Sequence, residues 1–132
     1  MKKWTQSKLE EAGYEIKNAK ILDADISTKD YASACLQIVI EGAGWGVVYG
    51  GRKLGHAGTY IKQEEIEATE KGFESILNIM WVLDADSLIE LKGKYVRVAT
   101  KGWGGRVEII GNILKDEWFD YESFFEEGEN KQ

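Results

Sequence analysis

Apolar and polar side chains alternate with a period of two in the first half of the chain. Between residues 35 and 41 every second residue is a large aliphatic one: Leu36, Ile38 and Ile40. This period is typical of a strand with one buried face. Segments 14–26 and 45–49 are also rich in aliphatic residues and predict two further strands. Glycines at 42, 44 and 46 predict a bend, so we expect an antiparallel meander.

The spacing of apolar residues changes to three or four after residue 65, which predicts an amphipathic helix. The residues expected on its buried face are Ile66, Phe73, Ile76, Leu77, Met80 and Leu83. Glutamates occupy most of the other positions of its first turns. The preceding segment 50–63 contains four glycines and predicts a long loop.

The last third of the chain returns to strand-like patterns. A capping-box pattern from Ser87 to Glu90 predicts a single helical turn that ends at Gly93. Segments 95–99 and 106–114 predict two strands joined by a turn over 101–105. The order of strands, helix and strands predicts an α+β fold, in which an antiparallel sheet packs against one main helix.

The length of 132 residues fits a single domain. We expect residues 1–13 to form an N-terminal arm or short helix and residues 14–125 to form one α+β ligand-binding domain. Residues 126–132 are expected to be a polar tail.

The charge balance excludes some classes of partner. The chain has 17 Lys and Arg against 23 Asp and Glu, a net charge of −6. General binding to duplex nucleic acid needs an excess of cations, so we do not expect it. There is no stretch of 18 apolar residues, and the N-terminus lacks a continuous apolar segment, so we expect neither membrane insertion nor secretion. The lone Cys35 cannot form an intrachain disulfide, which favours a reducing compartment, the cytoplasm.

The residues that usually carry catalysis are scarce. His56 is the only histidine, so a histidine-rich metal site is excluded. The segment 46–53 resembles a phosphate-binding loop, but its lysine is one position late and Leu54 stands where a hydroxyl is needed. The pairs Asp23 with Asp25 and Asp84 with Asp86 fit turns and caps better than paired catalytic carboxylates. We therefore expect no enzyme activity, no cofactor and no metal.

Two of the three arginines bracket a glycine-rich turn on the predicted last hairpin. Arg97 and Arg106 lie on either side of Lys101 and Trp103. Planar cationic groups beside an indole ring suit an anionic, aromatic ligand, because arginine binds phosphate at two points and tryptophan stacks on a base. The alternative is a solvated hairpin with an exposed tryptophan.

A second Gly-Trp-Gly sequence surrounds Trp45 on the earlier meander and is followed by Tyr49, Gly50 and Gly51. The alternative is a core tryptophan beside a β-bulge. We expect Arg97, Arg106 and Lys101 to hold phosphate, and Trp103 or Trp45 to stack on the base. The full set of expected ligand-binding residues is Arg97, Arg106, Lys101, Trp103, Trp45, Tyr49, Gly50, Gly51, Tyr95 and Asn112.

The segment 116–121 is acidic and aromatic together and is too apolar to remain in water. It either closes over a sheet edge or packs against another subunit. Aromatic residues near the two ends of the chain exceed what one helix and one small sheet can bury, which predicts at least a dimer with the ligand pocket near the subunit boundary. They are Trp4, Trp118, Phe119, Tyr121, Phe124 and Phe125.

Four short motifs carry a resemblance to a known family: YEIKNAK at 14–20, GWGVVYGG at 44–51, LKGKYVRV at 91–98 and IGNILKDEWF at 110–119. The chain resembles the first described type of Thoeris anti-defence proteins, the signal sponges of phages and prophages. The resemblance implies binding of cyclic ADP-ribose isomers that bacterial TIR-domain enzymes release, without cleavage, in the host cytoplasm. It also implies dimers or hexamers, some of which bind other cyclic nucleotides.

Two other functions stay open. The acidic positions 64, 65, 67, 70 and 74, together with the acidic tail, suit an inhibitor that mimics nucleic acid and blocks a DNA-binding defence enzyme. A cyclic-nucleotide phosphodiesterase would need Asp116 as the base and Arg97 beside the leaving phosphate.

Overall fold

The computed structural model describes residues 2–28, 33–56, 67–102 and 107–129. For residues 33, 50–56, 67 and 127–129 it describes the backbone only. The α+β fold expected from the pattern of strands and helix is confirmed.

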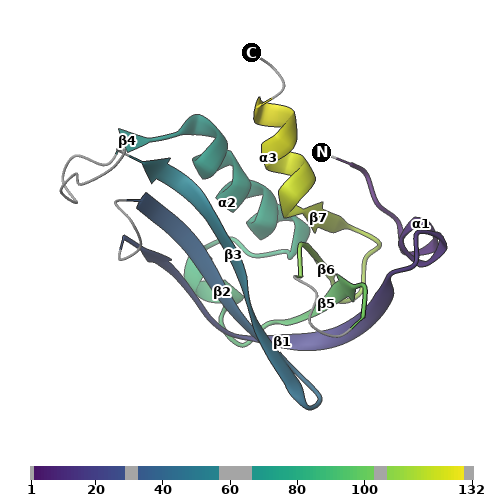
Figure 1. Cartoon of the computed structure of the whole chain (residues 1–132). Coiled ribbons are helices and arrows are strands. Elements are labelled where there is room, and N and C mark those ends of the chain that lie inside the picture. Colours follow the sequence, from purple (N-terminus) through teal and green to yellow (C-terminus); the bar gives the residue numbers. More distant parts are fainter. Residues whose placement is uncertain (1, 29–32, 57–66, 103–106, 130–132) are drawn as a thin grey trace.

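One antiparallel sheet organises the described part of the chain, with the strand order β4-β3-β2-β1-β5-β6-β7. Its strands are β1 (Glu15–Ser27), β2 (Ser33–Gly42), β3 (Trp45–His56), the two-residue β4 (Glu67–Ala68), β5 (Tyr95–Thr100), β6 (Ile109–Asn112) and β7 (Trp118–Asp120). Figure 1 shows the three long strands β1–β3 curving away from the shorter strands β5–β7. The predicted meander is β1–β2–β3.

Strand β1 joins the two halves of the sheet. Residues 20–27 of β1 pair with β2, and residues 15–20 pair with β5. A bulge at Leu22 shifts the register against β2. Because a bulge increases local twist, this position marks the change of direction between the long and the short strands.

Helix α2 (Glu70–Val82) covers one face of the sheet (Figure 1). Thr69 caps it, with its side-chain oxygen accepting a hydrogen bond from the Gly72 amide at 3.0 Å. The residues of the helix that face the sheet are Gly72, Ser75, Ile76, Ile79 and Val82.

The predicted buried face of this helix is confirmed for Ile76 and Leu83, which are buried, and Met80 packs partly buried against the core. Ile66 lies outside the described residues. Phe73 and Leu77 were expected inside, but 61% and 48% of their surfaces are exposed, and 66% of Trp81 is exposed. Gly72 and Ser75 lie against the sheet instead, because small side chains let the helix approach closely. An apolar stripe of Phe73, Leu77 and Trp81 is therefore left on the outer side of α2.

The N-terminal arm covers the opposite face of the sheet. It contains the short helix α1 (Gln6–Glu11), which Thr5 caps. Leu9 is fully buried against Ala99, Ile109 and Trp118. Trp4, Tyr14 and Ile16 are partly buried at the margin of this second core.

The aromatic C-terminal segment closes a sheet edge, which was the first of the two alternatives. Trp118–Asp120 form edge strand β7, and helix α3 (Tyr121–Glu129) packs beside α2 (Figure 1). The expected surplus of aromatic surface was wrong for most of its members: 4% or less of Trp118, Phe119 and Tyr121 is exposed, and 6% of Phe124. One chain buries them, so they no longer argue for a dimer.

Two other segments differ from their predictions. Residues 50–56 were expected in a loop, but they continue strand β3 to His56; residues 57–63 of that expected loop lie outside the described residues. The strand expected over 106–114 is limited to Ile109–Asn112. The expected single turn is present as a 3-10 turn, Leu88–Leu91, followed by Gly93 with a φ of 86°.

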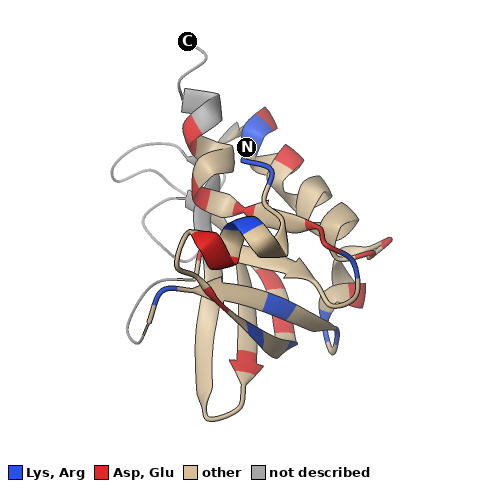
Figure 2. Ribbon diagram, turned by 90° about the vertical axis from the view of Figure 1, so that its right-hand side faces the viewer, with Lys and Arg blue, Asp and Glu red and all other residues tan. Residues whose placement is uncertain are grey.

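None of the helices in the described ranges is long and apolar enough to span a membrane. Figure 2 shows acidic and basic positions interspersed on the side that carries the N-terminal arm.

Phe119 provides a test of this core. Its ring is fully buried and lies 5.6 Å from Tyr121 and 5.2 Å from Phe124, centroid to centroid. Phe119→Ala is expected to lower the free energy of unfolding by about 3–5 kcal/mol, because it leaves a cavity. Phe73→Ala, on the exposed side of α2, is expected to change it by about 0.5 kcal/mol or less. Urea unfolding measures both; equal losses would contradict this placement of the two rings.

Candidate functional site

Arg97, the first expected phosphate ligand, serves to hold parts of the fold together. Its guanidinium donates hydrogen bonds to the Asn112 and Lys115 carbonyls, both at 2.8 Å, and to the Gln6 side-chain oxygen at 3.0 Å. It also lies over the Trp118 ring, 4.6 Å from its centroid. The guanidinium donors, which suit a phosphate, bind protein oxygens instead. These hydrogen bonds join α1 to the β6–β7 turn.

Trp45 and Trp118 each lie over a glycine on the neighbouring strand. Trp118 is paired with Gly111 and Trp45 with Gly42. A Cβ atom added to either glycine would overlap the indole ring. Trp45 therefore covers a glycine on the adjacent strand, which agrees with the alternative of a packed tryptophan at this Gly-Trp-Gly sequence. Trp103 of the other Gly-Trp-Gly sequence lies outside the described residues.

Asn112 is a structural junction. Only 5% of the residue is exposed. Its side-chain amide donates to the Val82 carbonyl at 2.9 Å and to Asp84 at 3.0 Å. Its side-chain oxygen accepts from the Leu114 and Lys115 amides. These bonds join the C-terminus of α2 to the β6–β7 turn, as expected for a buried, fully paired amide.

The other expected ligand residues that the structure describes are spread over different parts of the fold. Tyr49 is fully buried, and its hydroxyl donates to the Glu108 carbonyl at 2.9 Å. Tyr95 is 61% exposed, with the Lys20 ammonium 5.5 Å from its ring centroid. Gly50 and Gly51 lie in strand β3. Trp103 and Arg106 lie outside the described residues.

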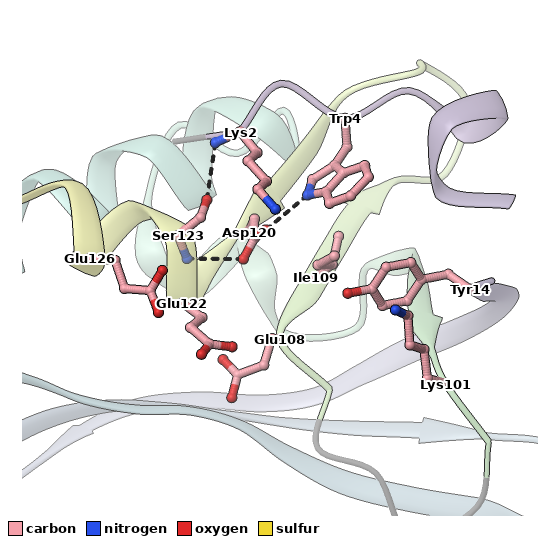
Figure 3. A pocket seen from close by; sticks show the side chains of 10 residues that line it. All are labelled: Lys2, Trp4, Tyr14, Lys101, Glu108, Ile109, Asp120, Glu122, Ser123 and Glu126. Atoms are coloured by element: carbon pink, nitrogen blue, oxygen red, sulfur yellow. Dashed lines mark hydrogen bonds between the residues drawn. The ribbon is translucent and has the colours of Figure 1, made fainter. Parts of the chain in front are cut away.

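Lys101 is an expected ligand residue that lines a cavity with basic, acidic and aromatic side chains. This cavity, which we term the arm cavity, has a volume of about 560 Å³ and lies between the N-terminal arm, the start of β6 and α3 (Figure 3). A volume of this size suits a small-molecule ligand. Its lining residues are Lys2, Trp4, Tyr14, Lys101, Glu108, Ile109, Asp120, Glu122, Ser123 and Glu126.

The N-terminal arm is fastened across this cavity by two hydrogen bonds (Figure 3). The Trp4 indole N–H donates to Asp120 at 2.8 Å, and the Lys2 amide donates to the Ser123 hydroxyl at 3.0 Å. Asp120 also accepts from the Ser123 amide at 3.1 Å. One wall of the cavity therefore depends on residues that are close together in space but more than a hundred positions apart in sequence.

The two sides of the arm cavity differ in charge. On one side the ammonium groups of Lys2 and Lys101 lie over the rings of Trp4 and Tyr14, 5.4 and 4.6 Å from the ring centroids. The other side carries the carboxylates of Glu108, Glu122 and Glu126, and Asp120 lies where the two sides meet, bonded to the Trp4 indole (Figure 3). The cavity is thus cationic and aromatic on one side and anionic on the other.

The pKa of Tyr14 is raised from its ordinary value, first by burial and then by the negative charges of Asp120, Glu122 and Glu108. Its phenol therefore stays protonated at neutral pH and is available as a hydrogen-bond donor. The hydroxyl points across the cavity toward Glu108 (Figure 3).

Two other cavities are lined by three further expected residues, Trp45, Tyr95 and Asn112. Trp45 lines an open groove of about 660 Å³ on the β2–β3 hairpin, whose walls are mostly aliphatic and glycine. Tyr95 and Asn112 line a cavity of about 370 Å³ with Lys94 and Leu114. Neither brings an arginine or a second aromatic ring to the ligand.

In the part of the chain that the structure describes, no group of three His, Cys, Asp or Glu side chains is placed to hold a metal ion. Asp116, the base that a phosphodiesterase would need, accepts hydrogen bonds from the Gln6 amide and the Trp118 indole, both at 2.7 Å.

Comparison with protein-family models, with curated proteins and with solved structures finds no match to this chain. The resemblance to the signal sponges therefore rests on the four short motifs alone.

Sequence reasoning missed Trp4, Tyr14 and the carboxylates of α3 as cavity residues. Trp4 was assigned to an arm and Glu122 to an acidic segment, and no local pattern links them. The available signal was the pair of aromatic residues that flank α1, Trp4 and Tyr14, whose rings meet edge to face at 5.8 Å.

Gly111 tests the cross-strand packing under Trp118. Gly111→Ala is expected to destabilise the fold by about 1–3 kcal/mol, because its Cβ would displace the indole ring. Gly46→Ala is the matched control, since its Cβ would meet only the Ile40 carbonyl at an ordinary 3.5 Å. Thermal unfolding of both variants measures the difference; a neutral Gly111→Ala would contradict the contact.

Asp84 predicts a pH dependence of stability. Its pKa is lowered, first by the hydrogen bond from Asn112 and then by that from Lys115, at 3.0 and 3.2 Å. A folded-state pKa below the unfolded value stabilises the fold at neutral pH, and this contribution is lost as the pH falls below about 4. Asp84→Asn, which tolerates the positive φ of this position, is expected to reduce the loss of melting temperature between neutral pH and pH 3. Asp86→Asn is the control, and an unchanged pH profile for Asp84→Asn would refute the assignment.

Proposed function

We propose that this chain binds a cyclic, ribose-containing nucleotide signal and holds it intact, acting by stoichiometric sequestration rather than by catalysis. The resemblance to the signal sponges names the signal as a cyclic ADP-ribose isomer and the process as Thoeris-type TIR signalling. The protein would work in the bacterial cytoplasm during phage infection or prophage carriage.

The arm cavity is the observation that supports this function best. It combines two ammonium groups, two aromatic rings, a protonated phenol and several carboxylates within about 560 Å³. A cyclic dinucleotide-like ligand offers matching groups, because its phosphates pair with ammonium groups and its bases contact aromatic rings. Carboxylates are common partners of ribose hydroxyls.

Sequestration needs tight binding without chemistry, and the described side chains fit that requirement. Asp116 and Arg97 are both engaged in the packing of α1, which weakens the phosphodiesterase alternative. The acidic-inhibitor alternative is weakened by α2, where Glu70 and Glu74 alternate with the exposed Phe73 and Leu77, unlike the uniform charge of a phosphate backbone.

Assembly as a dimer or hexamer stays a prediction. The aromatic side chains expected at the interface are buried in one chain, and the arm cavity is formed without a second copy. Among the described residues, the exposed apolar stripe of α2 is one surface that suits such contacts.

A retention assay tests the function. The purified protein is incubated with cyclic ADP-ribose, freed of unbound ligand and heat-denatured, and the released nucleotide is identified by mass spectrometry. We expect intact ligand at no more than one equivalent per site. A linear product, or clearance of a large excess of ligand by little protein, would show an enzyme instead.

Lys101 is the variant of choice for this assay. Lys101→Glu places a negative charge at the phosphate side of the arm cavity, so we expect retention to fall at least about tenfold. Lys92→Glu is the matched control, because Lys92 is exposed and lines none of the three cavities. Equal loss in both variants would point to net charge rather than to the cavity.

A further inference from the structure

The arm cavity is divided into a cationic side and an anionic side, and this division constrains how a nucleotide can lie in it. We infer that the carboxylate side binds sugar hydroxyls and that phosphates are accepted only beside Lys2 and Lys101. The ligand class is then a nucleotide with its phosphates gathered in one bridge and its ribose hydroxyls unmodified. This inference rests on the proposed function and deepens it.

The cationic side is formed by two exposed lysines whose ammonium groups lie over aromatic rings. Lys101 leaves the end of β5 and lies over the Tyr14 ring, while Lys2 lies over the Trp4 ring. Trp4 is held by its bond to Asp120 and by its edge-to-face contact with Tyr14. The two ammonium groups are therefore tied to one aromatic pair, and a phosphate bridge fits beside this pair.

The anionic side comes from different elements. Glu108 precedes β6, Asp120 ends β7, and Glu122 and Glu126 lie one helical turn apart on α3. Asp120 already accepts bonds from Trp4 and Ser123, so it orients the wall. Glu122 and Glu126 are exposed on the cavity side of α3 (Figure 3), where they can accept from a ligand.

The Tyr14 phenol lies between the two sides. Burial first, and then the carboxylates that face it, raise the pKa of the phenol, which keeps it a donor at the pH of the cell. A donor flanked by acceptors suits a ribose hydroxyl, which both donates and accepts. A second phosphate at this place would meet Glu108 and Glu122 and would be repelled.

The inference predicts discrimination between two ligands that differ by one phosphate. Cyclic ADP-ribose and cyclic ADP-ribose 2′-phosphate are titrated separately into the full chain by calorimetry. The wild type is expected to bind the first ligand about tenfold or more tightly than the second, because the added phosphate faces the carboxylate side.

Glu122→Gln tests whether Glu122 accepts a hydrogen bond from a ligand hydroxyl or only repels a phosphate. If Glu122 accepts from a hydroxyl, Glu122→Gln weakens binding of cyclic ADP-ribose roughly fivefold, since a charged acceptor is the stronger one, and narrows the gap between the two ligands. Glu74→Gln, on the outer side of α2, is the control and should change neither.

The outcomes separate the two proposals. If the wild type binds cyclic ADP-ribose but does not distinguish it from the 2′-phosphate, or if Glu122→Gln behaves as Glu74→Gln does, the orientation is wrong and the proposed function stands. If the wild type binds neither ligand, the proposed function fails and the orientation falls with it.

Discussion

The packing of the Trp118 ring over Gly111 holds together the half of the sheet that carries the N-terminal arm. Arg97, Gly111 and Trp118 are directly opposite one another on β5, β6 and β7. Because Gly111 has no side chain, Trp118 lies flat on the sheet and Arg97 stacks on the indole at 4.6 Å. Arg97 donates a hydrogen bond to the Gln6 side-chain oxygen of α1. The Asp116 carboxylate accepts hydrogen bonds from the Gln6 backbone amide and from the Trp118 indole N–H.

The arm cavity is a consequence of that packing. Helix α1 is fixed on the sheet by Leu9 and by the Gln6 contacts, and this leaves Trp4 and Tyr14 on its two sides. Trp4 can then reach Asp120 at the end of β7. A substitution at Gly111, under the Trp118 ring, would therefore shift the N-terminal arm and change the shape of the cavity, without itself contacting a ligand.

The strands were predictable because the alternation of apolar and polar residues is a local signal. It does not depend on which residue lies opposite on the neighbouring strand. Leu36, Ile38 and Ile40 alternate, and all three are fully buried. The buried face of α2 was only partly predictable from hydrophobicity. Ile76 is buried as expected, but Phe73 and Leu77 are largely exposed, and the small residues Gly72 and Ser75 lie against the sheet. Whether small residues or large apolar residues face the sheet depends on the distance between the helix and the sheet. No local sequence pattern contains that distance.

The candidate site was harder still, because the residue types chosen for ligand chemistry are also those that stabilise folds. Arginine forks and tryptophan rings bind phosphates and bases, but they equally bind carbonyls and cover glycines. In this chain the Arg97 guanidinium stacks on the Trp118 ring, and neither side chain lines the arm cavity. The cationic groups that line it are the ammonium groups of Lys2 and Lys101. A chain of net charge −6 that holds a nucleotide in this way would depend on the separation of charge within the cavity, not on an overall positive field.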